Sequence, residues 1–335
     1  MTDITEAADP ALAADASAQP PRSALARLTG RLEIRMLGLA LIIAIGLSLL
    51  SPYFLTQNNL LNILDQSVVI GIVAVGMTFV ILTGGIDLSV GSVAGLTGVI
   101  LGLSLQNFGI PVSIALAVLA GAGIGLFSGI LIAYFGLAAF VVTLGVMAIG
   151  RSLAYIFSGQ TAISGFPSEL SDIVYTTVLG IPANVLFLGA LYLLAWAYLT
   201  YTKGGRTIYA VGSNKEAARA AGLSVLFYSV LPYVVSGALA AVAVTFSIAQ
   251  ILSVDPLTGT ALELDAIAAV VIGGASLFGG RGSIVGTLIG ILIMVMIRNG
   301  LNLMGVSPFW QGSAIGGIII LALLAESVLS RRVLY

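Results

Sequence analysis

The chain contains neither cysteine nor histidine among its 335 residues. Without cysteine it can form no disulfide and no thiolate metal site. Without histidine it lacks imidazole ligands and the serine–histidine or cysteine–histidine pairs of many nucleophilic enzymes. These absences predict a protein with no catalytic residue, no metal site and no bound cofactor of its own.

Charged residues are scarce as well, at 8% of the chain, whereas 59% of the residues are hydrophobic. A soluble domain carries about 25% charged residues, and mean hydropathy here is +1.13. The net charge of −1 gives no reason to expect a nucleic-acid partner. The composition therefore predicts an integral membrane protein.

The first 35 residues differ from the rest of the chain. Residues 1–22 are acidic and rich in alanine and proline, a composition that predicts a disordered tail. A secretory signal would instead begin with basic residues. Arg27, Arg31 and Arg35 then fall on one helical face, which suits a short interfacial helix or simply a basic flank to the first span. We expect residues 1–35 to form a cytoplasmic tail.

Apolar runs recur along the remainder of the chain. A helix needs about 20 apolar residues to cross ~30 Å of hydrocarbon. The runs predict ten spans, near residues 36–55, 63–83, 86–107, 110–134, 138–158, 181–202, 226–250, 262–280, 283–304 and 310–329. Because no alternating pattern suggests a barrel, the predicted fold is an all-α bundle of about ten transmembrane helices over residues 36–329, with a short C-terminus at 330–335.

Basic residues indicate the orientation of this bundle. With the N-terminus in the cytoplasm, eleven of the 13 lysines and arginines fall on the cytoplasmic side, including Arg331 and Arg332 after the tenth span. The inverted arrangement would place nearly all of them outside, against the positive-inside rule. Both termini and a polar loop over residues 203–225 are therefore predicted to be cytoplasmic.

That polar loop reads KGGRTIYAVGSNKEAARAAGLS from Lys203 to Ser224. The segment from Glu216 to Ala221 has high helix propensity, and Gly222 suits the left-handed residue that ends a helix. A charged helix on the cytoplasmic face of a membrane protein gives a soluble partner a surface on which to act. The plain alternative is a solvated connector.

A second distinctive string, GMTFVILTGGIDLSVGS, places Asp87 beside an apolar run. A carboxylate at the bilayer centre costs about 2.5–3.5 kcal/mol on insertion scales, so Asp87 must lie near an interface, in a cavity or against a partner. The glycines around it suggest a broken helix that lines a polar space. Three roles stay open for Asp87: a helix N-cap, a residue of a pathway, or a contact with a cytoplasmic partner.

A partial echo of this string occurs later in the chain. The matched positions are Gly84-Gly85-x-x-Leu88 with Gly273-Gly274-x-x-Leu277, and Gly91-Ser92-x-x-Gly95 with Gly282-Ser283-x-x-Gly286. Both copies fall at predicted cytoplasmic turns between helices. In a chain with 41 glycines the echo could arise by coincidence; a true repeat would indicate two related half-bundles.

Taken together, these strings resemble the sugar branch of ABC importer permeases, of the ribose/xylose/galactose type, within the wider branched-chain amino acid/sugar permease family. The matching strings are NLLNILDQ (59–66), GGIDLSVG (84–91), FVVTLG (140–145), AVGSNKEAARAAG (210–222), DAIAAVVIGGASLFGGRGSIVG (265–286) and NGLNLMGVSPFWQ (299–311). The resemblance covers roughly residues 36–329. One departure is Asp65, where the family more often has an uncharged residue; its role is open.

The resemblance implies a permease subunit that passes a monosaccharide across the bacterial inner membrane. In such importers the polar loop docks into an ATP-hydrolysing subunit, and the residues expected to carry this coupling are Asn214, Glu216, Ala217, Ala218, Arg219 and Gly222. The implied partners are a second permease chain (identical or a sister), two ABC ATPase domains, a periplasmic sugar-binding protein and membrane lipid. ATP belongs to the partner, because neither lysine of this chain stands in a Gly-Lys-Ser/Thr phosphate loop.

A sugar pathway needs amides for hydroxyl groups and aromatic rings for the faces of the sugar. The residues expected to line it are Asn59, Asn62, Gln66, Asp87, Asn299, Asn302, Trp310 and Gln311. The three amides of the second span share one helical face. Such amides could instead join helices, at about 0.6 kcal/mol each. Both roles stay open.

Two further arginines fall within predicted spans. Arg151 and Arg298 are expected to bind carboxylates or backbone carbonyls, with Asp172 a candidate partner for Arg151. Besides the sugar permease, two transporters remain as alternatives: a branched-chain amino acid ABC permease and a self-powered secondary transporter. The second is disfavoured because histidine is absent and acids within the spans are few.

The orientation can be tested in this cysteine-free chain with single cysteines at Ser213 and Ser168. We expect an impermeant thiol reagent to label Ser168→Cys in intact cells and Ser213→Cys only after the membrane is opened. Labelling of Ser213→Cys in intact cells would overturn the predicted topology.

Overall fold

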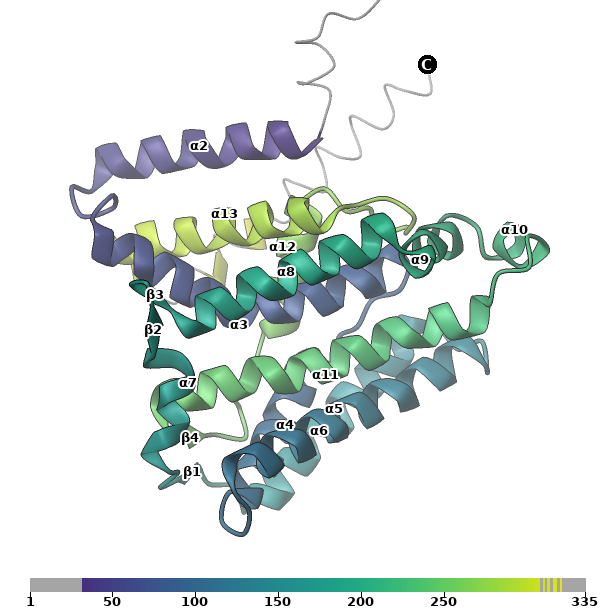
Figure 1. Cartoon of the computed structure of the whole chain (residues 1–335), viewed down its shortest axis with the longest axis horizontal. Coiled ribbons are helices and arrows are strands. Elements are labelled where there is room, and N and C mark those ends of the chain that lie inside the picture. The colour runs from purple at the N-terminus through teal and green to yellow at the C-terminus, as the bar shows by residue number, and fades with distance from the viewer. Residues whose placement is uncertain (1–31, 308–309, 311, 314–315, 318–319, 321–335) are drawn as a thin grey trace, which may run out of the picture.

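The computed structural model describes residues 32–307, together with 310, 312–313, 316–317 and 320. The described residues form a helical bundle (Figure 1). Seven of the described helices are long and apolar enough to cross a membrane: α2 (Leu32–Leu50), α3 (Gln57–Leu82), α5 (Ile110–Ala133), α6 (Ala139–Ser158), α8 (Ala183–Tyr201), α11 (Val225–Ile251) and α13 (Ile284–Leu303). The prediction of a polytopic all-α membrane protein is confirmed. Most of the predicted tail, most of the tenth span and the basic C-terminus lie outside the described residues.

Two helices of the bundle are much shorter than their predicted spans. The third predicted span is represented by α4 (Val90–Ser104) and the eighth by α12 (Leu262–Ile272). At 1.5 Å per residue, α4 extends only about 22 Å, less than the ~30 Å of a hydrocarbon core. Each short helix follows a non-helical segment that connects it to a long helix, and these two segments are the structural feature that the apolar windows did not resolve.

The bundle has two different ends (Figure 1). At one end lie α9 (Lys203–Ser213) and α10 (Lys215–Ala220), and we call this the inner end because the charge pattern predicts it to be cytoplasmic. At the opposite, outer end, short strands and turns connect the helices. These are β1 (Ile163–Ser164) paired antiparallel with β4 (Ser253–Val254), β2 (Thr177–Val178) paired antiparallel with β3 (Ile181–Pro182), the 3₁₀ turn η1 (Ser168–Ser171) and α7 (Asp172–Tyr175).

Glycines bring α5 and α11 close together. A Cβ atom on Gly121 would lie 2.3 Å from the carbonyl oxygen of Gly237, and one on Gly125 would lie 2.1 Å from that of Tyr233. Any side chain at these positions would force the two backbones apart. The Gly121-Gly125-Gly129 spacing therefore serves close helix packing, as expected of small residues in membrane bundles.

Two helix–loop–helix units of opposite direction organise the centre of the bundle. In one, α3 ends at the inner end and its loop leads back to α4; in the other, α11 ends at the outer end and its loop leads back to α12. The starts of the two short helices meet. A Cβ atom on Gly91, in the first turn of α4, would lie 2.2 Å from Oε2 of Glu263 and 2.3 Å from the carbonyl oxygen of Gly259.

The sequence echo marks a shared turn, but in a register that differs from the predicted one. Gly84 and Gly274 are the left-handed residues that end α3 and α12, with φ of 77° and 87°. In both, the next amide bonds the carbonyl five residues earlier, as in a Schellman motif. Gly84 therefore corresponds to Gly274, not to Gly273, and the residues before the following helices are Ser89 and Ser283.

Candidate functional site

The inner end carries two short helices joined at Asn214. Its side chain accepts a hydrogen bond from the amide of Ala217 at 2.9 Å and so caps α10. Gly222 follows the helix in the left-handed conformation (φ 75°), and the amide of Leu223 bonds the carbonyl of Ala218 at 3.1 Å. The short helix and its glycine stop are where the sequence predicts them.

The faces of α10 have different environments. Ala218 is 4% exposed and packs with Val211 and Val225. At 100° per residue, Glu216 and Ala220 lie on the side of the helix opposite Ala218, and both are exposed. Ala218 was predicted to form part of a docking surface, but its buried side chain holds α10 against the bundle, so the surface open to a partner is the side with Glu216 and Ala220.

Helix α9 contacts the end of α3 and the loop between α12 and α13. A Cβ atom on Gly212 would lie 1.8 Å from the carbonyl oxygen of Leu82 and 2.7 Å from the amide nitrogen of Gly280. The Gly280 amide itself donates to that same Leu82 carbonyl at 2.9 Å. The hydroxyl of Tyr209 donates to the carbonyl of Gly282 at 3.0 Å, and burial raises the pKa of this hydroxyl, which favours its protonated, donating form.

Asp87 lies in the loop between α3 and α4 and is 3% exposed. Its Oδ1 accepts from the amide of Ser89 at 3.0 Å and from the hydroxyl of Ser89 at 2.6 Å, and its Oδ2 accepts from the hydroxyl of Ser236 on α11 at 2.8 Å. Within the described residues it forms no ion pair. The carboxylate thus closes a turn at Ser89 and joins this turn to α11. Ser89, not Asp87, is the N-cap of α4 and makes no side-chain cap bond, so the predicted N-cap role is not found, and the pathway and partner roles stay predictions.

The contact to Ser236 could not be found from sequence. Ser236 lies in the interior of an apolar helix far along the chain, and an isolated serine in a span is usually satisfied by its own helix. In the structure a Cβ atom on Gly76 would lie 2.8 Å from the Cα atom of Ser236. This glycine therefore lets α11 come close enough for its serine to reach Asp87.

Arg151 of α6 holds the non-helical segment that precedes α12. Its Nη1 donates to the carbonyls of Pro256 and Thr258 at 2.6 and 3.1 Å. The expectation that Arg151 binds backbone carbonyls is confirmed, but Asp172 was the wrong candidate partner, because the guanidinium points to the segment before α12. Arg298 has the expected carboxylate partner, Asp265, at 3.0 Å.

The predicted pathway amides do not form one cluster. Asn59 and Asn299 are buried and exchange hydrogen bonds of 2.9 and 2.8 Å between their side chains, an interhelical contact of the kind left open as an alternative. Asn62, Gln66, Asn302 and Trp310 are exposed, and Gln311 lies outside the described residues. The pathway role of these residues stays a prediction.

Asp65 forms a contact that the sequence left open. Its carboxylate accepts from the side-chain amide of Asn184 on α8 and from that of Gln250 on α11, the latter at 3.2 Å. It therefore joins α3, α8 and α11 near the outer end. The hydroxyl of Tyr175 adds a bond to the carbonyl of Gln250 at 3.2 Å.

Comparisons with known proteins agree with this architecture. Residues 59–323 match the family described as "Branched-chain amino acid transport system / permease component". The ribose import permease protein RbsC of Escherichia coli strain K12 is 42% identical over 300 residues, which cover 87% of this chain and 92% of the relative. The RbsC protein of Haemophilus influenzae is 40% identical over 302 residues (88% and 93%). The D-allose transport system permease protein AlsC of Escherichia coli is 38% identical over 296 residues (88% and 90%).

No solved structure matches the chain. The family match nevertheless extends over more than three quarters of the sequence, from the start of α3 to beyond α13. Both the broken α4 unit with Asp87 and the inner-end helices α9 and α10 fall inside it. This chain belongs to the family of branched-chain amino acid transport system permease components.

Proposed function

We propose that this chain is the membrane-spanning subunit of an ATP-driven importer that passes a monosaccharide, with ribose as the first candidate, across the bacterial inner membrane. The observation that carries the proposal is the 42% identity to a ribose import permease over 87% of the chain. Relatives named for ribose and allose favour a sugar over a branched-chain amino acid, although the family carries the name of the latter.

Energy for transport comes from partner subunits in this proposal. The chain has no phosphate loop, and an exposed α10 at the inner end offers an ATP-hydrolysing subunit a place to dock. The complete importer contains a second permease chain, two ABC ATPase domains and a periplasmic sugar-binding protein. The permease itself performs no chemistry; it opens and closes a pathway.

The contacts of α9 suggest how movement of α10 reaches the centre of the bundle. Gly212 lies against the Leu82 carbonyl at the end of α3 and against Gly280. Two residues beyond Leu82 the chain turns into the loop that carries Asp87 to Ser236 on α11. Displacement of α10 therefore shifts the loop that begins α4, and with it the position of the half-helix in the bundle.

A self-powered secondary transporter is the alternative from another class. It requires titratable groups that exchange a coupling ion within the spans. Asp87 is buried there, but its oxygens already accept three hydrogen bonds, and the relatives include a protein named as a probable ABC transporter permease, at 38% identity. The ATP-driven reading is the better supported one.

Transport of ribose is tested in cells that lack their own ribose permease. We expect this chain, expressed with its cognate ATPase and sugar-binding subunits, to support uptake of labelled ribose. Unlabelled allose tests the breadth of the sugar class by competition, and labelled leucine is the control for the amino-acid alternative. Uptake of leucine without uptake of ribose would contradict the proposal.

Replacement of Asp87 separates a structural role from a role of its charge. Asp87→Asn keeps an acceptor for Ser89, so we expect most uptake to survive. Asp87→Leu leaves the donors of Ser89 and Ser236 without an acceptor, at about 1–3 kcal/mol for each buried group, so we expect low abundance and little uptake. If Asp87→Asn were abundant yet as inactive as Asp87→Leu, the negative charge itself would be required.

The docking surface on α10 is tested with a bulky residue on its outward side. We expect Ala220→Trp to insert normally but to lower sugar-stimulated ATP hydrolysis about tenfold or more, since a loss of about 1.4 kcal/mol in docking suffices for that. Weaker co-purification of the ATPase subunit should accompany the loss. The matched control is Ala162→Trp, at an exposed position of the outer end. Full sugar-stimulated hydrolysis by Ala220→Trp would mean that α10 is an ordinary connector.

A further inference from the structure

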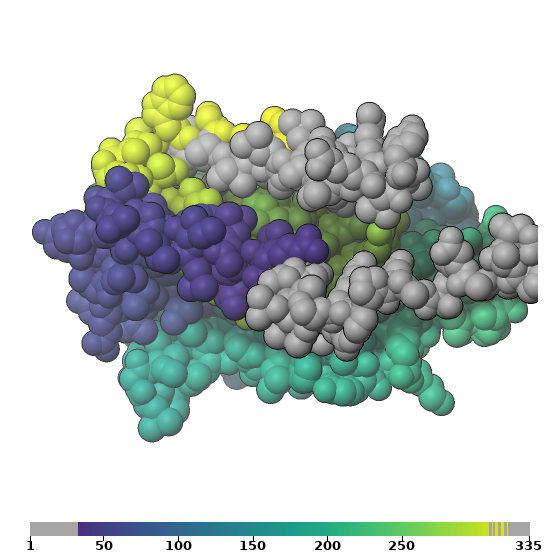
Figure 2. Space-filling view, turned by 90° about the horizontal axis from the view of Figure 1, so that it is seen from above, coloured from purple at the N-terminus to yellow at the C-terminus, as the bar shows by residue number. Residues whose placement is uncertain are grey.

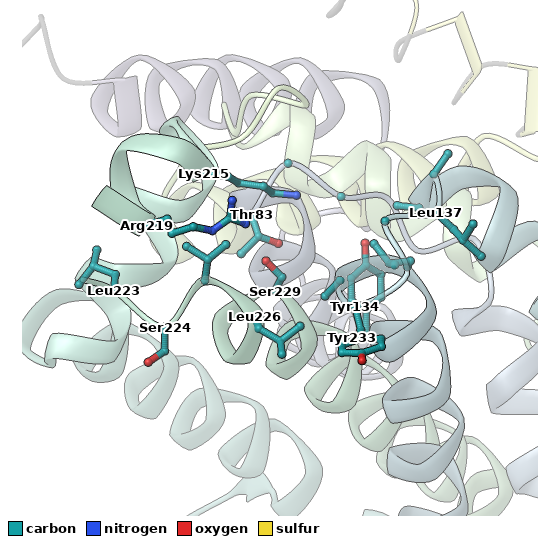
Figure 3. A pocket seen from close by; sticks show the side chains of 18 residues that line it. Thr83, Tyr134, Leu137, Lys215, Arg219, Leu223, Ser224, Leu226, Ser229 and Tyr233 are labelled. Carbon is teal, nitrogen blue, oxygen red and sulfur yellow. The ribbon is translucent and has the colours of Figure 1, made fainter. Parts of the chain in front are cut away.

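A cleft of about 610 Å³ opens at the inner end, beside α10 (Figure 3). One wall is formed by α10 and the start of α11, and the other by the turn between α5 and α6. The turn that follows α3, with Gly84 and Gly85, also contributes to its lining. The volume falls within the ~300–1,000 Å³ of typical small-molecule sites.

The side of the cleft formed by α10 is positively charged. Lys215 and Arg219, one helical turn apart, extend from α10 into the cleft, opposite Tyr134 and Leu137 (Figure 3). No aspartate or glutamate is among the residues that line it. Within the described residues neither cation forms an ion pair. The cleft therefore carries two positive charges that the part of the chain shown by the structure does not neutralise.

Two buried hydroxyl groups also line the cleft. Tyr233 is 2% exposed and Ser229 is 6% exposed, and no hydrogen bond of either hydroxyl to another described residue is present. The described residues contain no fully buried polar side-chain atom that lacks a partner, so neither hydroxyl is sealed from solvent, and both residues line the cleft. The Tyr233 oxygen lies against Gly85, where a Cβ atom would come within 2.2 Å of it.

The cations and the hydroxyls lie at different depths. Tyr233 is two turns of α11 beyond Val225, which corresponds to about 12 Å along the axis, whereas Lys215 and Arg219 are on α10, before α11 begins. The cleft thus combines a cationic mouth with an interior of uncharged hydroxyl groups. A complementary ligand has an anionic group at one end and hydrogen-bonding groups at the other.

We propose that this cleft binds the phosphate ester of a polyol, with the phosphate held by Lys215 and Arg219 and the polyol hydroxyls bonded to Ser229 and Tyr233. Guanidinium and ammonium groups form strong charge-assisted bonds to phosphate. Two sources share this chemistry. One is a soluble sugar phosphate, and the other is the glycerophosphate headgroup of an anionic lipid, since basic pockets between helices on the cytoplasmic side suit such headgroups.

A bound phosphate would join α10 to the turn between α5 and α6. Because Lys215 and Arg219 belong to the helix proposed to receive the ATPase, the ligand would fix the position of that helix. This consequence rests on the proposed function. A soluble ligand would come from phosphoryl transfer to the imported monosaccharide, so its binding would slow import when the phosphorylated product accumulates.

The site is tested with the full-length permease in nanodiscs of phosphatidylcholine, without ATPase or binding protein. Ribose 5-phosphate, inorganic phosphate and ribose are the probes, and the melting temperature is the readout. We expect ribose 5-phosphate to raise the melting temperature in a concentration-dependent way and ribose to have no effect. Lys215→Gln with Arg219→Gln should weaken ribose 5-phosphate about tenfold or more, since charge-assisted bonds are lost.

Two variants make the test specific. The matched control is Lys203→Gln with Arg206→Gln, which removes the same charge from exposed positions of α9 outside the cleft and should leave binding unchanged. Ser229→Ala should weaken ribose 5-phosphate but not inorganic phosphate, because only the ester carries the polyol.

A lipid arm distinguishes the two sources. If phosphatidylglycerol in the nanodisc raises the melting temperature through Lys215 and Arg219 and abolishes the effect of ribose 5-phosphate, the natural ligand is a lipid headgroup. The proposal is overturned if neither compound stabilises the protein, or if the control variant loses binding as much as the cleft variant. This experiment measures binding and not transport. Ribose 5-phosphate can therefore stabilise the protein even if ribose uptake fails, and ribose uptake can succeed even if ribose 5-phosphate does not bind.

Discussion

The non-helical segments that precede α4 and α12 depend on one requirement. A backbone that leaves helical geometry within a bilayer must find its hydrogen-bond partners in the protein. Asp87 provides acceptors for the turn that begins α4. Arg151 provides donors for the carbonyls before α12. The presence of these two ionisable side chains within the bundle is thus explained by the backbone groups to which they hydrogen-bond. Their loss would leave these backbone groups without their side-chain partners, at about 1–3 kcal/mol for each buried group.

Glycine makes this arrangement sterically possible. The two short helices meet where Gly91 lies against Gly259 and Glu263, and the inner-end junction forms where Gly212 lies against Leu82. Neither contact leaves room for a Cβ atom. Glycine has no side chain to separate the backbones, so it permits distances that no other residue allows. At these two contacts the close packing itself requires glycine.

The sequence predicted features that depend on neighbours in the chain. Helix propensity and the glycine stop located α10. Features that depend on distant segments were not predictable in this way. Nothing near Asp87 indicates Ser236, and the shared helical face of Asn59 and Asn62 does not reveal that only Asn59 would face α13. Likewise, the sequence places Ala218 on an exposed helix, but its side chain packs against Val211 and Val225 and cannot contact a partner.

The amide contacts of Asp65 have a mechanical consequence. They fasten α3 to α8 and α11 at the outer end, whereas the α9 junction meets α3 at its opposite end, at Leu82. From Asp65 the helix continues to Leu82 at its inner end, roughly 26 Å at 1.5 Å per residue, so a tilt of α3 about this contact would displace Leu82 most. The fixed point of such a tilt would be the Asp65 carboxylate, which contacts α8 and α11 at once.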